Sequence, residues 1–90
     1  MTSDELTAFT EAIRARAADV SAELSSIDPA TLTPLQRNEL ARLRAVWSGF
    51  RELSEADAME VHRALTELFG ELTLDQSIAV IQREYSPRLR

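Results

Sequence analysis

Apolar and polar residues alternate with a helical period along almost the whole chain. In four segments the apolar residues recur at steps of three and four, the spacing of one face of an α-helix. Just ahead of each segment a Ser or Thr is followed three residues later by Glu, Gln or Asp, which is the pattern of a capping box. The four pairs are Thr2/Glu5, Thr33/Gln36, Ser54/Asp57 and Thr73/Gln76. The pattern predicts a compact all-α bundle of four helices, over about 4–25, 34–53, 55–69 and 74–85.

Proline and glycine support these boundaries. Pro29 ends the first helix because the residue before a proline avoids the α region, and Pro34 fits the first position of the second helix. Gly70 is a good terminator for the third. The boundary at Ser54 is the least defined, since the apolar phase continues through it; a single helix over 34–69, and so three helices in all, is the alternative. We favour the break because Ser caps a helix better than it occupies its interior.

Length and composition limit the class of protein. The chain has 90 residues, 44% of them hydrophobic, which predicts one helical domain over 1–87 followed by a short basic tail, 88–90. No apolar run is long enough to span a membrane, and the polar first residues are unlike a signal peptide, so we expect a cytoplasmic protein. The chain has no Cys. Without a disulfide or a Cys-metal site, burial against a partner or in a homodimer would add useful stability.

The charged residues are unevenly distributed. The formal net charge of −5 argues against a nucleic-acid partner bound by bulk charge. From 37 to 51 there are four Arg and one acid, whereas from 52 to 75 there are seven acids and one Arg. All ten basic residues are Arg. This agrees with the codon usage of a GC-rich bacterium or its phage; selection against Lys-directed modification is the other interpretation.

Three arginines and the only tryptophan form the strongest functional pattern. Arg37, Arg44 and Arg51 are seven residues apart and share one line on the second predicted helix, with Trp47 at its edge. Trp and Arg are enriched at binding hot spots. We therefore predict that these four residues bind the acidic surface or groove of another protein. The alternative is that Trp47 belongs to the core and that the arginines pair with the acidic third helix of the same chain.

Catalytic chemistry has few candidates. His62 is the only histidine, and the chain offers neither a Cys nucleophile nor the HExxH spacing of a zinc site. The acids over 52–75 lie on predicted helices, where they form a solvated face, and not in a Gly-containing calcium loop. With two Gly in the chain, a phosphate-binding loop has little to be built from. We predict that the protein is not an enzyme and has no catalytic residue, cofactor or metal site.

Two resemblances bear on function. Residues 69–75, Phe-Gly-Glu-Leu-Thr-Leu-Asp, followed by Ile78 and Ile81, resemble the closing segment of small helical bacterial antitoxins, including the VbhA-like partners of Fic toxins. That family has the inhibitory motif Ser/Thr-x-x-x-Glu-Gly/Asn. Its nearest match is 7–12, which places Glu11 at the glutamate and departs at the last position, Ala12. The resemblance implies a protein that inhibits a partner enzyme.

The tripeptide Trp47-Ser48-Gly49 resembles the WXG family of secreted helical-hairpin proteins, which implies one long helix on each side of it. From all these patterns we predict a non-enzymatic regulator or inhibitor that binds another protein through a helix face. It would belong with antitoxins, phage-encoded inhibitors or adaptors. The alternatives are a self-assembling structural subunit and a WXG-type secreted protein.

Overall fold

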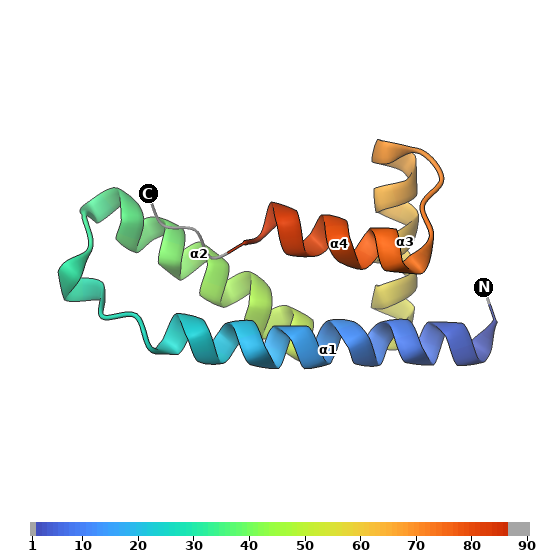
Figure 1. The fold of residues 1–90 in the computed structure, drawn as a ribbon, viewed down its shortest axis with the longest axis horizontal. Coiled ribbons are helices and arrows are strands. Elements are labelled where there is room, and N and C mark those ends of the chain that lie inside the picture. The colour runs from blue at the N-terminus through green and yellow to red at the C-terminus, as the bar shows by residue number, and fades with distance from the viewer. Residues whose placement is uncertain (1, 87–90) are drawn as a thin grey trace.

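The structure, a computed structural model, describes residues 2–86 and is all-α in that range. Its helices are α1 (Ser3–Ser25), α2 (Pro34–Arg51), α3 (Glu55–Phe69) and α4 (Leu74–Glu84), with a short 3₁₀ turn at Pro29–Thr31 between α1 and α2 (Figure 1). The prediction of four helices is confirmed. The predicted basic tail, 88–90, lies outside the described residues. None of the described helices is long and apolar enough to cross a membrane.

The predicted capping residues begin all four helices. Thr33 and Thr73 form complete capping boxes, in which the hydroxyl accepts the N–H of a Gln three residues on and the Gln side chain accepts the cap's own N–H. Thr2 and Ser54 accept the backbone N–H three residues on. Because Ser54 has extended dihedral angles (φ −81°, ψ 162°) and α2 ends at Arg51, the chain breaks there and the single-helix alternative is wrong.

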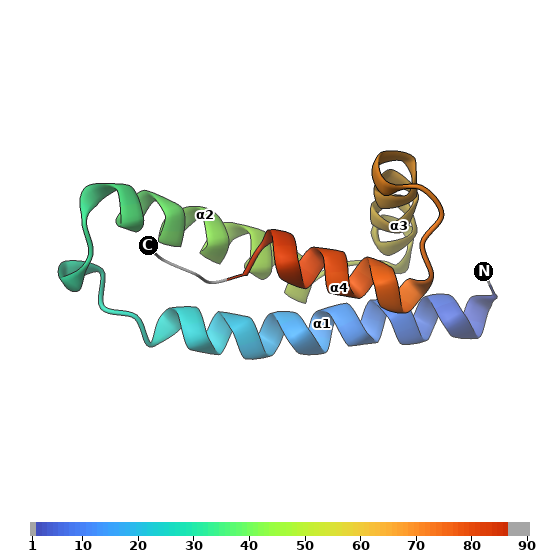
Figure 2. The same cartoon turned by 45° about the horizontal axis from the view of Figure 1, so that its top comes forward.

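Helix α1 is the central element and packs against the other three helices. Helix α2 runs back along its C-terminal half, and α4 lies along its N-terminal half (Figures 1 and 2). The predicted apolar stripe of α1 is buried between them; its core members are Phe9, Ile13, Ala17, Val20 and Leu24. Helix α2 buries Leu40, Leu43 and Trp47 against this stripe.

Helix α3 stands steeply across the direction of α1 (Figures 1 and 2). Its Ala58 belongs to the core, and its Val61 and Leu65 pack against the core. Ala58 is 0% exposed, whereas Leu68, near the other end, is 77% exposed. The described residues measure 45 × 23 × 16 Å along their principal axes, so the bundle is elongated. The protruding part of α3 places apolar side chains at the surface.

Candidate functional site

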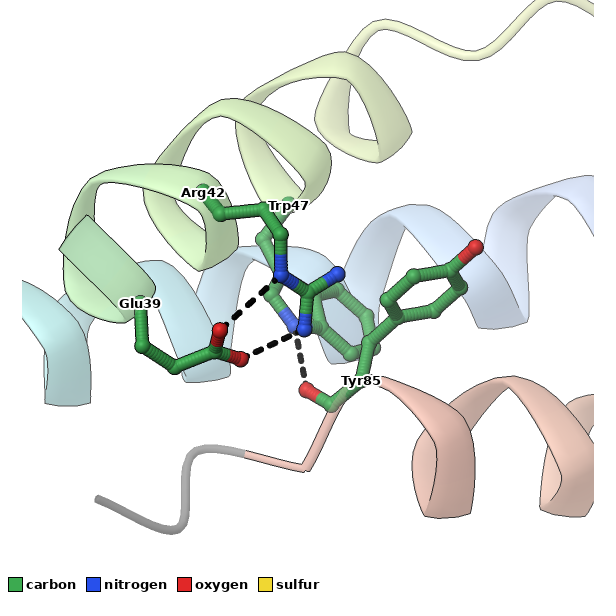
Figure 3. Close-up of polar contacts among 4 residues, drawn as sticks. All are labelled: Glu39, Arg42, Trp47 and Tyr85. Atoms are coloured by element: carbon green, nitrogen blue, oxygen red, sulfur yellow. Dashed lines mark hydrogen bonds and ion pairs between the residues drawn. The ribbon is translucent and has the colours of Figure 1, made fainter. Parts of the chain in front are cut away.

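Trp47 is a core residue and not a surface contact. Its side chain is 1% exposed, and its indole Nε1 donates a hydrogen bond of 2.8 Å to the backbone oxygen of Tyr85 (Figure 3). Its ring packs edge-on against Phe50, with centroids 5.3 Å apart. The prediction that Trp47 contacts a partner is therefore wrong, because a partner cannot reach its side chain in this conformation. Trp47 instead holds the end of α4 against α2.

Two of the three predicted arginines bind backbone carbonyls of their own chain. Arg44 Nη2 donates to the oxygens of Leu24 (3.0 Å) and Ile27 (3.4 Å) at the end of α1. Arg37 Nη1 donates to the oxygen of Leu32 at 2.7 Å. Helix α1 has no basic residue in its own last turn. Arg44 therefore places a positive charge where the orphan carbonyls and the helix dipole favour one.

The alternative for the arginine line, ion pairing with the acidic third helix, is not found either. Within the part of the chain that the structure describes, the ion pairs are Arg42–Glu39, Arg63–Glu60 and Arg83–Glu84. None of them joins α2 to α3. Arg51 is exposed at the end of α2. The four predicted residues thus do not form one surface.

An apolar groove of about 540 Å³ lies between α3, α4 and the second half of α2. We call it the α3–α4 groove. Its apolar lining comes from all three helices: Phe50, Val61, Ala64, Leu65, Leu68, Phe69, Val80, Ile81 and Tyr85. At its edge Leu68 is 77% and Phe69 49% exposed. The groove exists because α3 leans away from α1 and none of the helices within residues 2–86 covers it.

An aromatic row forms one wall of the groove. Phe50 packs edge-on against both Trp47 and Tyr85, with ring centroids 5.3 and 5.8 Å apart. The guanidinium of Arg42 lies over the Tyr85 ring, 5.8 Å from its centroid (Figure 3). Since Trp47 also binds the Tyr85 backbone, this wall is fixed to the core. A rigid wall suits binding, because little side-chain freedom is lost on contact.

Charged side chains border the groove. Arg42 and Glu84 line it, and Arg42 binds Glu39 through two hydrogen bonds of 3.1 and 2.5 Å (Figure 3). These hydrogen bonds lower the pKa of Glu39 and raise the pKa of Arg42, and the attraction between their charges acts in the same direction. Both side chains are substantially exposed, so solvent screens this pair.

His62 has a partner that the sequence did not indicate. Its Nδ1 lies 2.6 Å from the hydroxyl oxygen of Ser77, across the α3–α4 contact. Its ring packs edge-on against Phe9, with ring centroids 5.7 Å apart. A Ser–His pair is the start of a nucleophile–base arrangement. Here, however, Ser77 is 0% exposed, so a substrate cannot reach its hydroxyl. The pair satisfies a buried hydroxyl between two helices.

Other candidate chemistry is sparse. No group of three or more His, Cys, Asp or Glu side chains within residues 2–86 is placed to hold a metal ion. The Trp47-Ser48-Gly49 tripeptide lies inside α2, and the chain turns only after Arg51. A 3₁₀ turn at Pro29–Thr31 also interrupts the helical segment that precedes Trp47. Both observations differ from the hairpin that the WXG resemblance implies.

The groove could be predicted from sequence only in part. Val61, Leu65 and Leu68 continue the apolar helical phase, and the spacing itself does not show that half of this stripe stays open. One available signal was the adjacent pair Leu68-Phe69 in the last turn of α3, because neighbouring residues point about 100° apart on a helix. Two such side chains are hard to bury against one neighbour.

Comparisons with known proteins do not assign a family to this chain. No family model matches it, and neither the curated proteins nor the solved structures contain a significant match.

Proposed function

We propose that the chain is a small, non-enzymatic regulator or inhibitor that binds another protein, of the antitoxin, phage-inhibitor or adaptor class. The α3–α4 groove would accept the apolar face of a helix from that partner. One observation carries the proposal: an apolar groove, walled by fixed aromatic rings, lies open at the surface. An amphipathic helix laid into such a groove is a recurrent mode of recognition.

The exposed edge of the groove favours a protein over a small ligand. A small molecule held among the lining residues would leave Leu68 and Phe69, 77% and 49% exposed, in contact with water. A helix long enough to run along α3 would cover both. Exposed apolar patches of this kind often mark protein interaction sites.

Inhibition is the form of regulation that the antitoxin resemblance suggests. Glu11, the residue aligned with the inhibitory glutamate of that family, is exposed on α1. Helix α1 contributes no residue to the lining of the α3–α4 groove. The groove would hold the partner, and exposed residues elsewhere on the chain remain free to act on it.

The test compares two variants as baits in extracts of the source organism. Leu68→Gln/Phe69→Gln removes the apolar edge of the groove, and Leu35→Gln is the matched control, because Leu35 is 76% exposed on α2 and lies outside the groove. We expect wild type and the control to recover the same partner. The double variant should recover at least about tenfold less, since burial of each large apolar side chain contributes about 1.5–3 kcal/mol.

Thermal unfolding serves as the folding control. All three residues are exposed, so the melting temperatures should agree within a few degrees. Equal recovery by the double variant and wild type would show that the groove is not the docking site. Recovery that is lost in both variants alike would show that the contact depends on surface apolarity in general.

A further inference from the structure

We propose that the occupant of the α3–α4 groove is a basic amphipathic helix of about three turns. This inference rests on the proposed function and adds the chemistry of the partner. It follows from the charges along the rim of the groove, from the large apolar side chains exposed on the chain, and from the length of the open part of α3.

Exposed carboxylates flank the groove on two sides. On α4, Glu84 is itself a lining residue. On α3, Glu60 and Glu67 lie four residues before and three residues after Ala64, which also lines the groove. Residues three and four apart are neighbours on a helix surface, so these two carboxylates border Ala64. All three Glu residues are exposed to solvent.

The basic residues nearby leave this rim negative. Arg42 is the one cation among the lining residues, and Glu39 holds it through two hydrogen bonds. Arg63 pairs with Glu60, and Arg83 pairs with Glu84 at 3.8 Å, but all four side chains are more than half exposed, so both pairs are weak and open to competition. Glu67 has no ion pair in the described part of the chain. A partner helix with Arg or Lys beside its apolar stripe would match this rim.

A second copy of this chain is a poorer fit. If two grooves met about a two-fold axis, the same carboxylates would face one another, and like charges in contact oppose association. If another surface entered the groove instead, it would need exposed large apolar side chains. Outside α3, the only one in the described range is Leu35. The basic face of α2 otherwise exposes small residues, Ala41, Ala45 and Ser48.

The length of the occupant follows from α3. The open part runs from Val61 to Phe69, which at a rise of 1.5 Å per residue extends about 12 Å. A helix of about three turns, with apolar residues at i, i+4, i+7 and i+11, covers that length. Its flanking positions then face Glu60 and Glu67 on one side and Glu84 on the other.

The test is selection from a displayed library of 16-residue peptides. Apolar residues are fixed at the four positions above, and the others are randomised with equal acidic and basic input. The full chain is the target, and Leu65→Asp, which places a charge in the groove, is the counter-target. We expect peptides enriched on the wild type alone, with a net positive charge relative to the input pool.

The enriched peptides are then measured against two triple variants. Glu60→Gln/Glu67→Gln/Glu84→Gln neutralises the rim, whereas Asp4→Asn/Asp19→Asn/Glu23→Gln removes the same charge from exposed positions of α1, outside the groove. The rim variant should bind the peptides about tenfold more weakly than wild type, since each exposed ion pair contributes about 1.5- to 5-fold in affinity. The α1 variant should bind them about as tightly as wild type.

The outcomes separate the two proposals. The proposal of a basic partner would be overturned if the enriched peptides were neutral or acidic, or if the two triple variants lost equal affinity for them. The groove would then still be a site that binds helices. No enrichment on the wild type over Leu65→Asp would overturn the groove as a docking site. Circular dichroism shows whether Leu65→Asp is folded. If it is unfolded, Leu68→Gln/Phe69→Gln replaces it as the counter-target.

Discussion

Residue type alone does not distinguish a binding surface from an internal support. Trp47 and Arg44 belong to the types that dominate binding hot spots, yet one is buried and the other binds the carbonyls of Leu24 and Ile27. Arg14 also binds a backbone carbonyl: its Nε donates a hydrogen bond of 2.6 Å to the oxygen of Leu53, just after the end of α2. Because its fork carries several donors, Arg suits helix ends as well as partners.

Arg44 and Arg51 should therefore differ in their effect on stability. We expect Arg44→Gln to lower the free energy of unfolding by about 1 kcal/mol, because it loses charge-assisted hydrogen bonds to the end of α1. Arg51→Gln, on an exposed residue, should change it by less than about 0.5 kcal/mol. Urea unfolding followed by Trp47 fluorescence measures both. Equal effects of the two substitutions would contradict the structural role of Arg44.

The seven-residue spacing of Arg37, Arg44 and Arg51 predicted a shared line on α2, but not what the line would face. That depends on the path of the segment between α1 and α2, which brings the carbonyls of Ile27 and Leu32 within reach of two of them. Loop paths leave no periodic pattern in a sequence. For this reason the structure differs most from the prediction at Trp47 and the three arginines.

At the level of elements, local chemistry was sufficient. The helix starts follow from Ser and Thr hydroxyls, each of which accepts a backbone N–H close by in the chain. The end of α3 follows from Gly70, which has φ 85° and ψ −174°, a conformation that is essentially restricted to glycine. These interactions span three or four residues, so they can be predicted without knowledge of the tertiary structure.

The two glycines of the chain should respond oppositely to alanine. Gly70→Ala should destabilise the fold by about 1–3 kcal/mol, because an L-residue is strained at that backbone conformation. Gly49→Ala should stabilise it by about 1 kcal/mol, since Gly49 is inside α2 and, apart from its chain neighbours and the backbone of its own helix, no atom lies within 4 Å of an added Cβ.

Thermal and urea unfolding of the two glycine variants give the comparison, with wild type as the reference. A stabilising Gly70→Ala would mean that the turn between α3 and α4 adopts another conformation. A destabilising Gly49→Ala would mean that something approaches α2 at that point, as a bound partner or second copy would.

The direction of α3 could not be predicted in the same way. Apolar spacing tells which face of a helix is buried, but not the angle at which the helix crosses its neighbour. Phe50, Val61 and Leu65 continue one stripe, and both a long helix and a crossing helix are compatible with it. The crossing is what exposes Leu68 and creates the groove. The main candidate site is therefore a property of tertiary arrangement.

The whole molecule is less compact than its length requires. Its Cα radius of gyration is 14.2 Å, whereas a compact domain of this size has about 12 Å. The difference lies in the long α1 and in the protruding α3 (Figure 1). A partner in the α3–α4 groove would bury the apolar surface that the chain leaves open, and so stabilise the complex by mass action.

We expect added salt to favour self-association of the free chain, whereas it would weaken an assembly held together by opposite charges. If the basic segment of α2 met the acidic α3 of a neighbour, oligomers would form at low salt and dissociate at high salt. The acidic rim of the groove predicts the reverse. The chain should be monomeric at low ionic strength because Glu60, Glu67 and Glu84 repel their counterparts. Near 1 M salt this repulsion is screened within about 3 Å. A weak dimer through Leu68 and Phe69 then becomes possible.

Sedimentation velocity at micromolar concentration distinguishes the two cases. The decisive control is Leu68→Gln/Phe69→Gln, which keeps every charge and removes the apolar edge, and which should remain monomeric at both salt concentrations. Oligomers that form at low salt and persist in this variant would place the self-contact on the charged helices instead. The free chain would then be a subunit of an assembly, and the groove would need another explanation. A monomer at low salt leaves the groove open for a partner of opposite charge, which is the state that the proposed regulator would hold until its target is present.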